Sequence, residues 1–142
     1  MKIHIITVGA PKLEYAKTGW NEYIGRLQHY HQVRISHISD KNNDSEHLLA
    51  AAKGSYLVTL TIDGPQYTSH ELAAFLERRA QAGQELCFMI GGPDGLAASV
   101  IAAAHQEVGL SRLTFPHDLA MVILAESLYR ASTINSNQPY HR

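Results

Sequence analysis

The chain has 142 residues and a formal net charge of −1, which fits one domain and excludes a globally basic protein that attracts RNA by charge alone. No apolar run is long enough to cross a bilayer, so no membrane partner is expected. Cys87 is the only cysteine and lies in an apolar stretch, which excludes an internal disulfide and predicts a cytoplasmic location.

The first half of the chain alternates strand and helix patterns. Residues 2–8 show an alternating apolar pattern and are rich in β-branched side chains, which predicts a strand. Apolar residues at helical spacing predict an amphipathic helix over 12–30. A second strand is expected at 33–38, a short helix at 45–53, and a third strand at 56–62 that is apolar enough to be central in a sheet.

The second half continues this alternation. Ser69 could cap a helix that Gly83 ends. The elements that follow are expected to be a strand at 85–90, a helix at 96–104, a short strand at 108–113 and a helix at 119–133. The pattern predicts a single α/β domain over residues 1–142, with a mostly parallel sheet and helices on both faces.

Three loops follow the predicted strands at the edge where open parallel sheets bind ligands, namely Asp63–Pro65, Gly91–Gly95 and Thr114–Asp118. The paired glycines of the second loop allow the backbone to approach a ligand where a Cβ atom would clash. A tight turn without a ligand explains the same residues equally well. The loop has neither the dinucleotide pattern nor the lysine of a phosphate loop, so a nucleotide pocket is poorly supported.

The last predicted helix is apolar around nearly its whole circumference, so it must be buried on most sides. This predicts a homodimer built partly on the helix. A central helix wrapped by the chain itself explains the pattern equally well. Glu126 and Arg130 stand four residues apart on it and can pair with each other, or Arg130 can reach toward a phosphate at a dimer seam.

The polar tail ends in Tyr140, His141 and Arg142, three side chains that can stack on bases, move protons and bind phosphate. Its composition alone favours disorder. The histidines show no metal-ligand spacing, so no metal site is expected. They are interpreted as surface or structural residues, with His117 as the possible exception because it lies in a strand-end loop.

Three segments closely resemble the RlmH family of the SPOUT superfamily: KIHIITVG, FMIGGPDG and LTFPHDLAMVILAESLYRASTINSNQPYHR. The resemblance spans essentially the whole chain. It implies an enzyme that uses S-adenosyl-L-methionine to methylate N3 of a pseudouridine in helix 69 of 23S ribosomal RNA of the large subunit, within the assembled ribosome. It also implies a homodimer and a C-terminal trefoil knot that holds the cofactor.

The resemblance also assigns residues by position. The cofactor-binding positions are Leu60, Ile90, Gly91, Gly92, Ser111, Arg112, Leu113, Thr114, Phe115 and Pro116. The substrate end of the site is expected to hold Glu126, Arg130, Tyr140, His141 and Arg142. His141 is the first candidate for the proton acceptor, because imidazole titrates near neutral pH.

One segment departs from the family. Many relatives carry a longer Lys/Arg-rich stretch between the second and third strands, whereas residues 39–55 here contain only Lys41 and Lys53. This predicts a reduced RNA-facing charge. The alternatives are a SPOUT-type methyltransferase acting on another RNA such as tRNA, a non-catalytic ribosome- or RNA-binding module, and a flavodoxin-like nucleotide-binding protein.

Overall fold

Five segments pair into one fully parallel sheet in the computed structural model, which describes residues 1–142. The strands run in the order β2-β1-β4-β3-β5 across the sheet. They are β1 (Lys2–Val8), β2 (Gln32–Ile38), β3 (Tyr56–Leu60), β4 (Leu86–Ile90) and β5 (Gln106–Val108). The central strand β4 is buried along its whole length, as expected for a parallel sheet covered on both sides.

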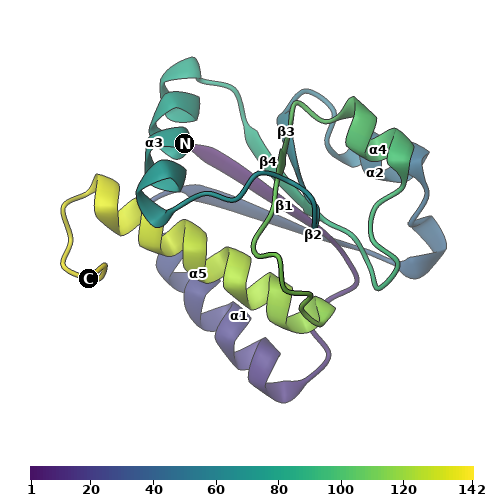
Figure 1. Ribbon diagram of the computed structural model, residues 1–142, viewed down its shortest axis with the longest axis horizontal. Helices are drawn as coiled ribbons and strands as arrows, with labels where there is room; N and C mark the ends of the chain where they lie inside the picture. Colours follow the sequence, from purple (N-terminus) through teal and green to yellow (C-terminus); the bar gives the residue numbers. More distant parts are fainter.

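Helices cover both faces of the sheet (Figure 1). The larger layer holds α1 (Glu14–Leu27), α3 (Ser69–Ala82) and α5 (His117–Asn135), and the smaller holds α2 (Ser45–Ala51) and α4 (Ala98–Ala103). Successive strand residues point to opposite layers, so Phe88 joins the larger core and Met89 the smaller. The predicted α/β architecture is confirmed, whereas the trefoil knot stays a prediction.

Several predicted boundaries were wrong, including the third strand, which ends at Leu60 and not at residue 62, and the fifth strand, which spans 106–108 and not 108–113. Thr68, not Ser69, caps α3: its hydroxyl accepts the backbone N–H of Glu71, and the Glu71 carboxylate accepts the N–H of Thr68. The fifth strand ends at Val108, because the N–H of Gly109 turns to the carbonyl of Pro65 and the chain leaves the sheet. Gly83 ends α3 in the left-handed conformation, as predicted.

The last helix has no exposed residue between His117 and Ile134. α5 buries one face, including Met121, Leu124 and Leu128, against α1, α3 and the sheet. Its other apolar side chains, such as Val122 and Ile123, are partly buried. The wrapped-helix alternative and the homodimer both stay predictions. No helix of the structure combines the length and hydropathy needed to cross a membrane.

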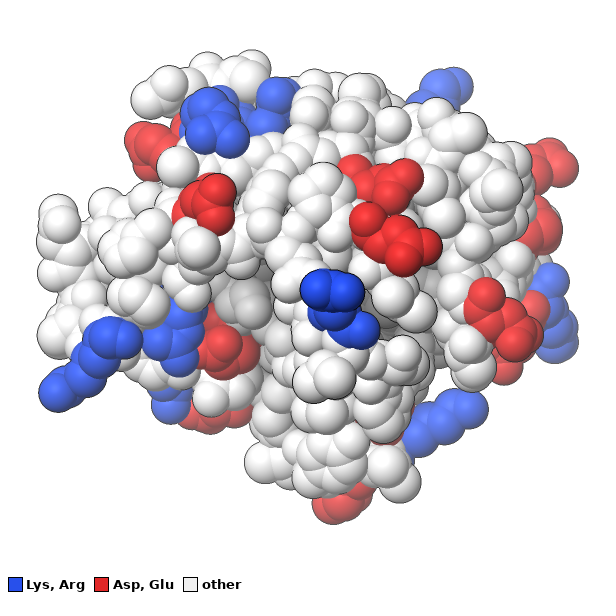
Figure 2. All heavy atoms as spheres, viewed as in Figure 1, with Lys and Arg blue, Asp and Glu red and all other residues white.

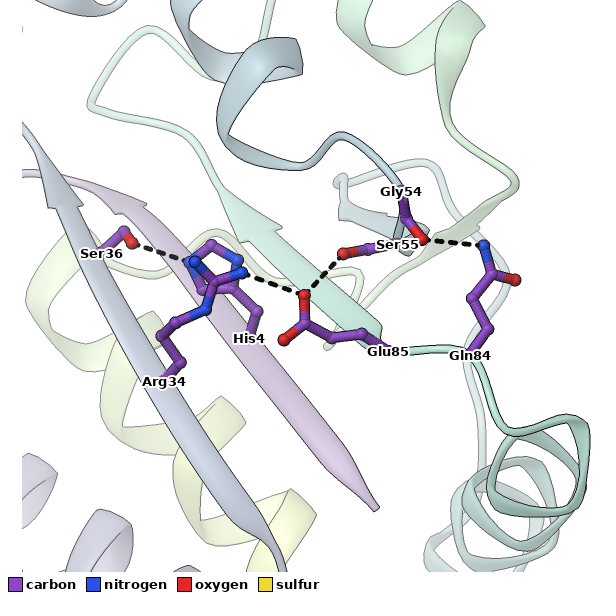
Figure 3. Close-up of polar contacts among 7 residues, drawn as sticks. All are labelled: His4, Arg34, Ser36, Gly54, Ser55, Gln84 and Glu85. Carbon is purple, nitrogen blue, oxygen red and sulfur yellow. Dashed lines mark hydrogen bonds and ion pairs between the residues drawn. The ribbon is translucent and has the colours of Figure 1, made fainter.

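A polar cluster ties together the beginnings of the strands (Figure 3). The Glu85 carboxylate, directly before β4, accepts hydrogen bonds from Arg34 on β2 at 3.0 Å and from Ser55 at 2.9 Å. His4 on β1 lies 2.7 Å from the Ser36 hydroxyl. Burial alone would raise the pKa of Glu85, but the hydrogen bonds from Ser55 and Arg34 hold it below its ordinary value. The cluster fixes the edge of the sheet opposite the strand-end loops.

A second polar contact links the turn before β2 to α5. The Ser132 hydroxyl donates to the carbonyl of Leu128, so it accepts the hydrogen bond from His31 Nε2 at 2.9 Å. Burial, reinforced by the nearby N-terminal ammonium group, lowers the pKa of His31 to about 4. His31 is therefore neutral in the native state at pH 7.

This lowered pKa predicts acid sensitivity. In the unfolded chain, His31 has the ordinary histidine pKa of about 6.5 and takes up a proton below that pH. In the native state, His31 takes up this proton only near pH 4. The free energy of unfolding should therefore fall as the pH drops from 6.5 to 4. Urea titrations should show a weaker fall in His31→Gln. The exposed His29→Gln is the control and should keep the wild-type slope. Equal slopes in the wild type and His31→Gln would contradict this account.

Candidate functional site

A cavity of about 450 Å³ opens at the carboxyl ends of β3, β4 and β5. This is the edge where ligands bind in open parallel sheets. Its walls are residues 60–63, 90–96, 110, 111 and 113–115, together with Ile101, His117 and Ala120. All three loops selected from the sequence contribute to it, and the first turn of α5 closes one side.

Most of the predicted cofactor positions line this cavity. Those that do are Leu60, Ile90, Gly91, Gly92, Ser111, Leu113, Thr114 and Phe115. Arg112 and Pro116 belong to the same loop but lie outside the lining. The structure thus brings the predicted positions to one place, while their role in binding stays a prediction.

The loop after β4 depends on a close approach between two stretches of backbone. A Cβ atom on Gly91 would lie 2.6 Å from the carbonyl carbon of Gly95, closer than any side chain allows. Gly95 itself has a φ of 76°, and its N–H donates to the carbonyl of Gly92. A Cβ atom on Gly92 would instead meet the side chain of Val8 at 3.3 Å. Gly91 is therefore the position at which only glycine fits.

The loop after β3 and the chain that follows β5 meet in a similar way. A Cβ atom on Gly109 would lie 2.5 Å from the carbonyl oxygen of Gly64, and one on Gly64 would lie 2.8 Å from the carbonyl carbon of Val108. The N–H of Gly109 donates to Pro65, and the N–H of Thr61 donates to Val108. Backbone contacts therefore hold the loop after β3 against the chain that follows β5.

The charged groups of the cavity lining are all acidic. Asp63 and Asp94 line it and are exposed, and no lysine or arginine does. Glu107 stands behind one wall, where its carboxylate accepts a hydrogen bond from Thr61 Oγ1 at 3.1 Å. Such a lining suits a ligand with positive charge better than one with phosphates. No group of three or more His, Cys, Asp or Glu side chains is arranged to hold a metal ion.

Asp118 fixes the first turn of α5. One carboxylate oxygen accepts the backbone N–H groups of Lys12 and Leu13 at 2.8 and 2.7 Å. Burial alone would raise the pKa of Asp118, but these two hydrogen bonds and the neighbouring His117 hold it below its ordinary value. The contact joins the segment before α1 to the helix turn that carries His117 and Ala120 into the cavity wall.

The tail forms a second cluster on α5. Tyr140 packs on Tyr129, with 4.6 Å between ring centroids, and its hydroxyl donates to Glu126 Oε1 at 3.1 Å. Arg130 binds the same oxygen at 2.7 Å, lies 4.7 Å over the Tyr140 ring, and contacts His141 Nδ1 at 3.2 Å. The predicted Glu126–Arg130 pair is confirmed. Its partners show that the tail packs on the helix, contrary to the disorder that its composition favoured.

The arrangement also constrains protonation. Burial, with Tyr23 and Glu126 alongside, raises the pKa of Tyr140 above its ordinary value, so the phenol keeps its proton at neutral pH. Arginine has no acceptor atom, so His141 Nδ1 accepts the hydrogen bond from Arg130. His141 also meets the ring of His70 edge-on at 5.0 Å. Arg142 is exposed.

The two clusters are separate within one chain. No tail residue lines the cavity. Glu126, which holds Tyr140, lies nine residues from the cavity residue His117, or about 14 Å along the helix axis. Figure 1 shows the end of the chain beyond the far end of α5.

Figure 2 shows acidic and basic side chains interspersed over the face it displays, with no broad basic patch. This agrees with the small net charge of the chain. Sequence reasoning missed the acidic lining and the Asp118 contact. Asp63 and Asp94 lie inside the predicted loops, so their negative charge could have indicated the acidic lining. The partners of Asp118 lie more than 100 residues away, so no local pattern reveals them.

A family profile described as "Predicted SPOUT methyltransferase" matches residues 1–141. The chain belongs to the SPOUT methyltransferase family. Two SPOUT relatives are each 48% identical to it over 145 aligned positions. They are the ribosomal RNA large subunit methyltransferase H of Deinococcus deserti, aligned over all of both chains, and that of Deinococcus radiodurans, aligned over 100% of this chain and 99% of the relative.

Solved structures agree on the fold. A probable methylase family protein from Haemophilus influenzae superposes with a TM-score of 0.63 over 99% of this chain and 70% of its own, at 12% identity. This likeness concerns the fold alone.

The close backbone approach predicts that Gly91→Ala destabilises the protein. The added methyl meets the backbone of Gly95, which has little room to move, so we expect a loss of about 1–3 kcal/mol in the free energy of unfolding. The control is Gly25→Ala in α1, where an added Cβ meets nothing within 4 Å. It should be neutral or stabilise by up to about 1 kcal/mol. Chemical denaturation of both variants checks the pair, and equal stabilities would contradict the prediction.

Proposed function

We propose that this chain is an S-adenosyl-L-methionine-dependent methyltransferase that methylates N3 of a pseudouridine in helix 69 of 23S ribosomal RNA. The names of the Deinococcus relatives and their full-length match support the ribosomal RNA substrate over a tRNA. We propose that the substrate is presented within the assembled ribosome, in the cytoplasm. The mixed surface charge supports this, because free RNA would call for a stronger basic surface.

The cavity is the observation that carries the proposal. Its walls combine glycine backbone, apolar side chains such as Ile90 and Leu113, and the carboxylates of Asp63 and Asp94. S-adenosyl-L-methionine has an adenosyl group, two positive charges (sulfonium and ammonium) and one negative charge (its own carboxylate). Its net charge is therefore positive. The residues present fit this molecule, and the acidic lining disfavours the phosphates that a flavodoxin-like alternative requires.

The tail supplies the groups that the reaction needs from the protein. The bound cofactor supplies an electrophilic methyl group. The nitrogen that receives the methyl carries a proton in its neutral form, so a nearby base helps. His141 Nδ1 is the acceptor atom available, and Arg130 occupies it here. Arg130 therefore has to turn from His141 toward the substrate, where it can stabilise the anionic base or a phosphate.

The Tyr140 ring has a complementary role. Its half-buried ring is held by Tyr129 and Arg130, so it offers a fixed aromatic surface. A nucleotide taken out of its helix can stack on such a surface. Glu126 holds both Arg130 and Tyr140 through a single oxygen atom, which keeps the two groups together.

The separation of the two clusters supports a homodimer in which the tail of one subunit serves the cavity of its partner. Large apolar side chains are exposed where such a partner would meet the cavity. Ile62 and Leu113 line the cavity itself, Leu13 belongs to the segment held by Asp118, and Tyr15 follows that segment. Burying these side chains against a second copy removes apolar surface from water.

Replacement of His141, the proposed base, should reduce turnover without weakening cofactor binding. His141→Ala should bind S-adenosyl-L-methionine with the wild-type affinity in calorimetry, because His141 does not line the cavity. Its methylation rate on large ribosomal subunits should fall about 100-fold or more. His29→Ala, at an exposed position outside both clusters, is the control. Wild-type turnover in His141→Ala would remove this residue from the mechanism.

Mixed dimers test whether the site is shared between subunits. Thr114→Trp fills the cavity from an exposed position, and His141→Ala removes the base, so neither homodimer should be active. In a shared site, each mixed dimer keeps one intact combination of cavity and tail. Random mixing should then restore about a quarter of the wild-type activity, since half of the dimers are mixed. If each tail serves its own cavity, mixing restores nothing.

A further inference from the structure

The acidic side chains of the cavity lining bear on which charge of ligand the cavity prefers. Asp63 follows β3 and Asp94 follows β4, so they approach the cavity from two separate loops. They are the only Asp, Glu, Lys or Arg side chains that line it. Arg112, on the third loop, lies outside the lining and does not neutralise them there.

The size of the cavity keeps any charge inside it close to both carboxylates. A sphere of its volume is only about 9.5 Å across, which is near the Debye length of about 8 Å at physiological ionic strength. A positive charge anywhere in the cavity is therefore attracted by both groups. Since Asp63 and Asp94 are exposed, solvent weakens the attraction without removing it.

Methyl transfer changes the charge of the molecule in the cavity. The bond between sulfur and the methyl carbon breaks while the bond between the ring nitrogen and that carbon forms. The bonding electron pair stays on sulfur, which becomes neutral, and the proton of the ring nitrogen goes to the base. The ammonium and carboxylate groups of the methionine part are unchanged. Cofactor and by-product therefore differ by one positive charge and one methyl group.

We infer that Asp63 and Asp94 make the cavity selective for the charged methyl donor over S-adenosylhomocysteine, the neutral by-product, and so favour release of the by-product after each turnover. The inference rests on the proposed function. Groups common to the two molecules cancel when their affinities are compared. The ratio of the two dissociation constants therefore isolates the effect of the sulfonium charge.

The test is calorimetric titration of the full-length protein with each molecule at low ionic strength. Asp63→Asn and Asp94→Asn should each lower the preference for S-adenosyl-L-methionine about two- to threefold, and the double variant about fivefold. Binding of S-adenosylhomocysteine should change little. The matched control is Glu77→Gln, which removes an exposed carboxylate beside Met1, at the opposite edge of the sheet. Its ratio should equal that of the wild type.

Salt provides a measurement that needs no variant. Raising the salt concentration should lower the preference of the wild-type protein toward that of the double variant, because added ions screen the two carboxylates. An unchanged ratio in the double variant, or in the wild type at high salt, would overturn the inference while leaving the proposed function intact. Failure of the wild type to bind either molecule would instead remove the proposed function itself.

Discussion

The cavity of this protein depends on backbone segments that touch where no side chain fits. Gly91 meets Gly95 within one loop, and Gly64 meets Gly109 between two others. Each contact brings carbonyl and N–H groups of neighbouring segments into hydrogen bonds that side chains would keep apart. The first contact shapes the loop after β4, the second holds the loop after β3 against the chain after β5, and the cavity is lined by these segments.

This dependence explains what could be predicted from the sequence. The strand and helix periods of β1, β4 and α1 are set by local patterns, so the α/β class and the strand-end loops were predictable. The end of β5 was not, because Gly109 leaves the sheet in response to Gly64, 45 residues earlier. The predicted cap of α3 was one residue too late. Thr68 and Ser69 both carry a hydroxyl group that can cap a helix, and only the reciprocal hydrogen bonds with Glu71 identify Thr68.

The tail shows a different limit of sequence reasoning. Composition favours disorder for a short polar end, because few apolar groups are available for burial. Here Glu126 and Tyr129 on α5 provide a hydrogen-bond acceptor and an aromatic ring at the spacing that Tyr140 needs. The tail is ordered by specific partners, and such partners become visible only when the helix and the returning chain are placed together. The family resemblance grouped the tail residues with the site, but it could not show that within one chain they lie apart from the cavity.

The Asp118 carboxylate has a mechanical consequence. Because it binds the backbone just before α1, it ties the start of α1 to the start of α5. The exposed side chain of Leu13 and the helix turn that carries His117 and Ala120 into the cavity wall therefore share one anchoring group.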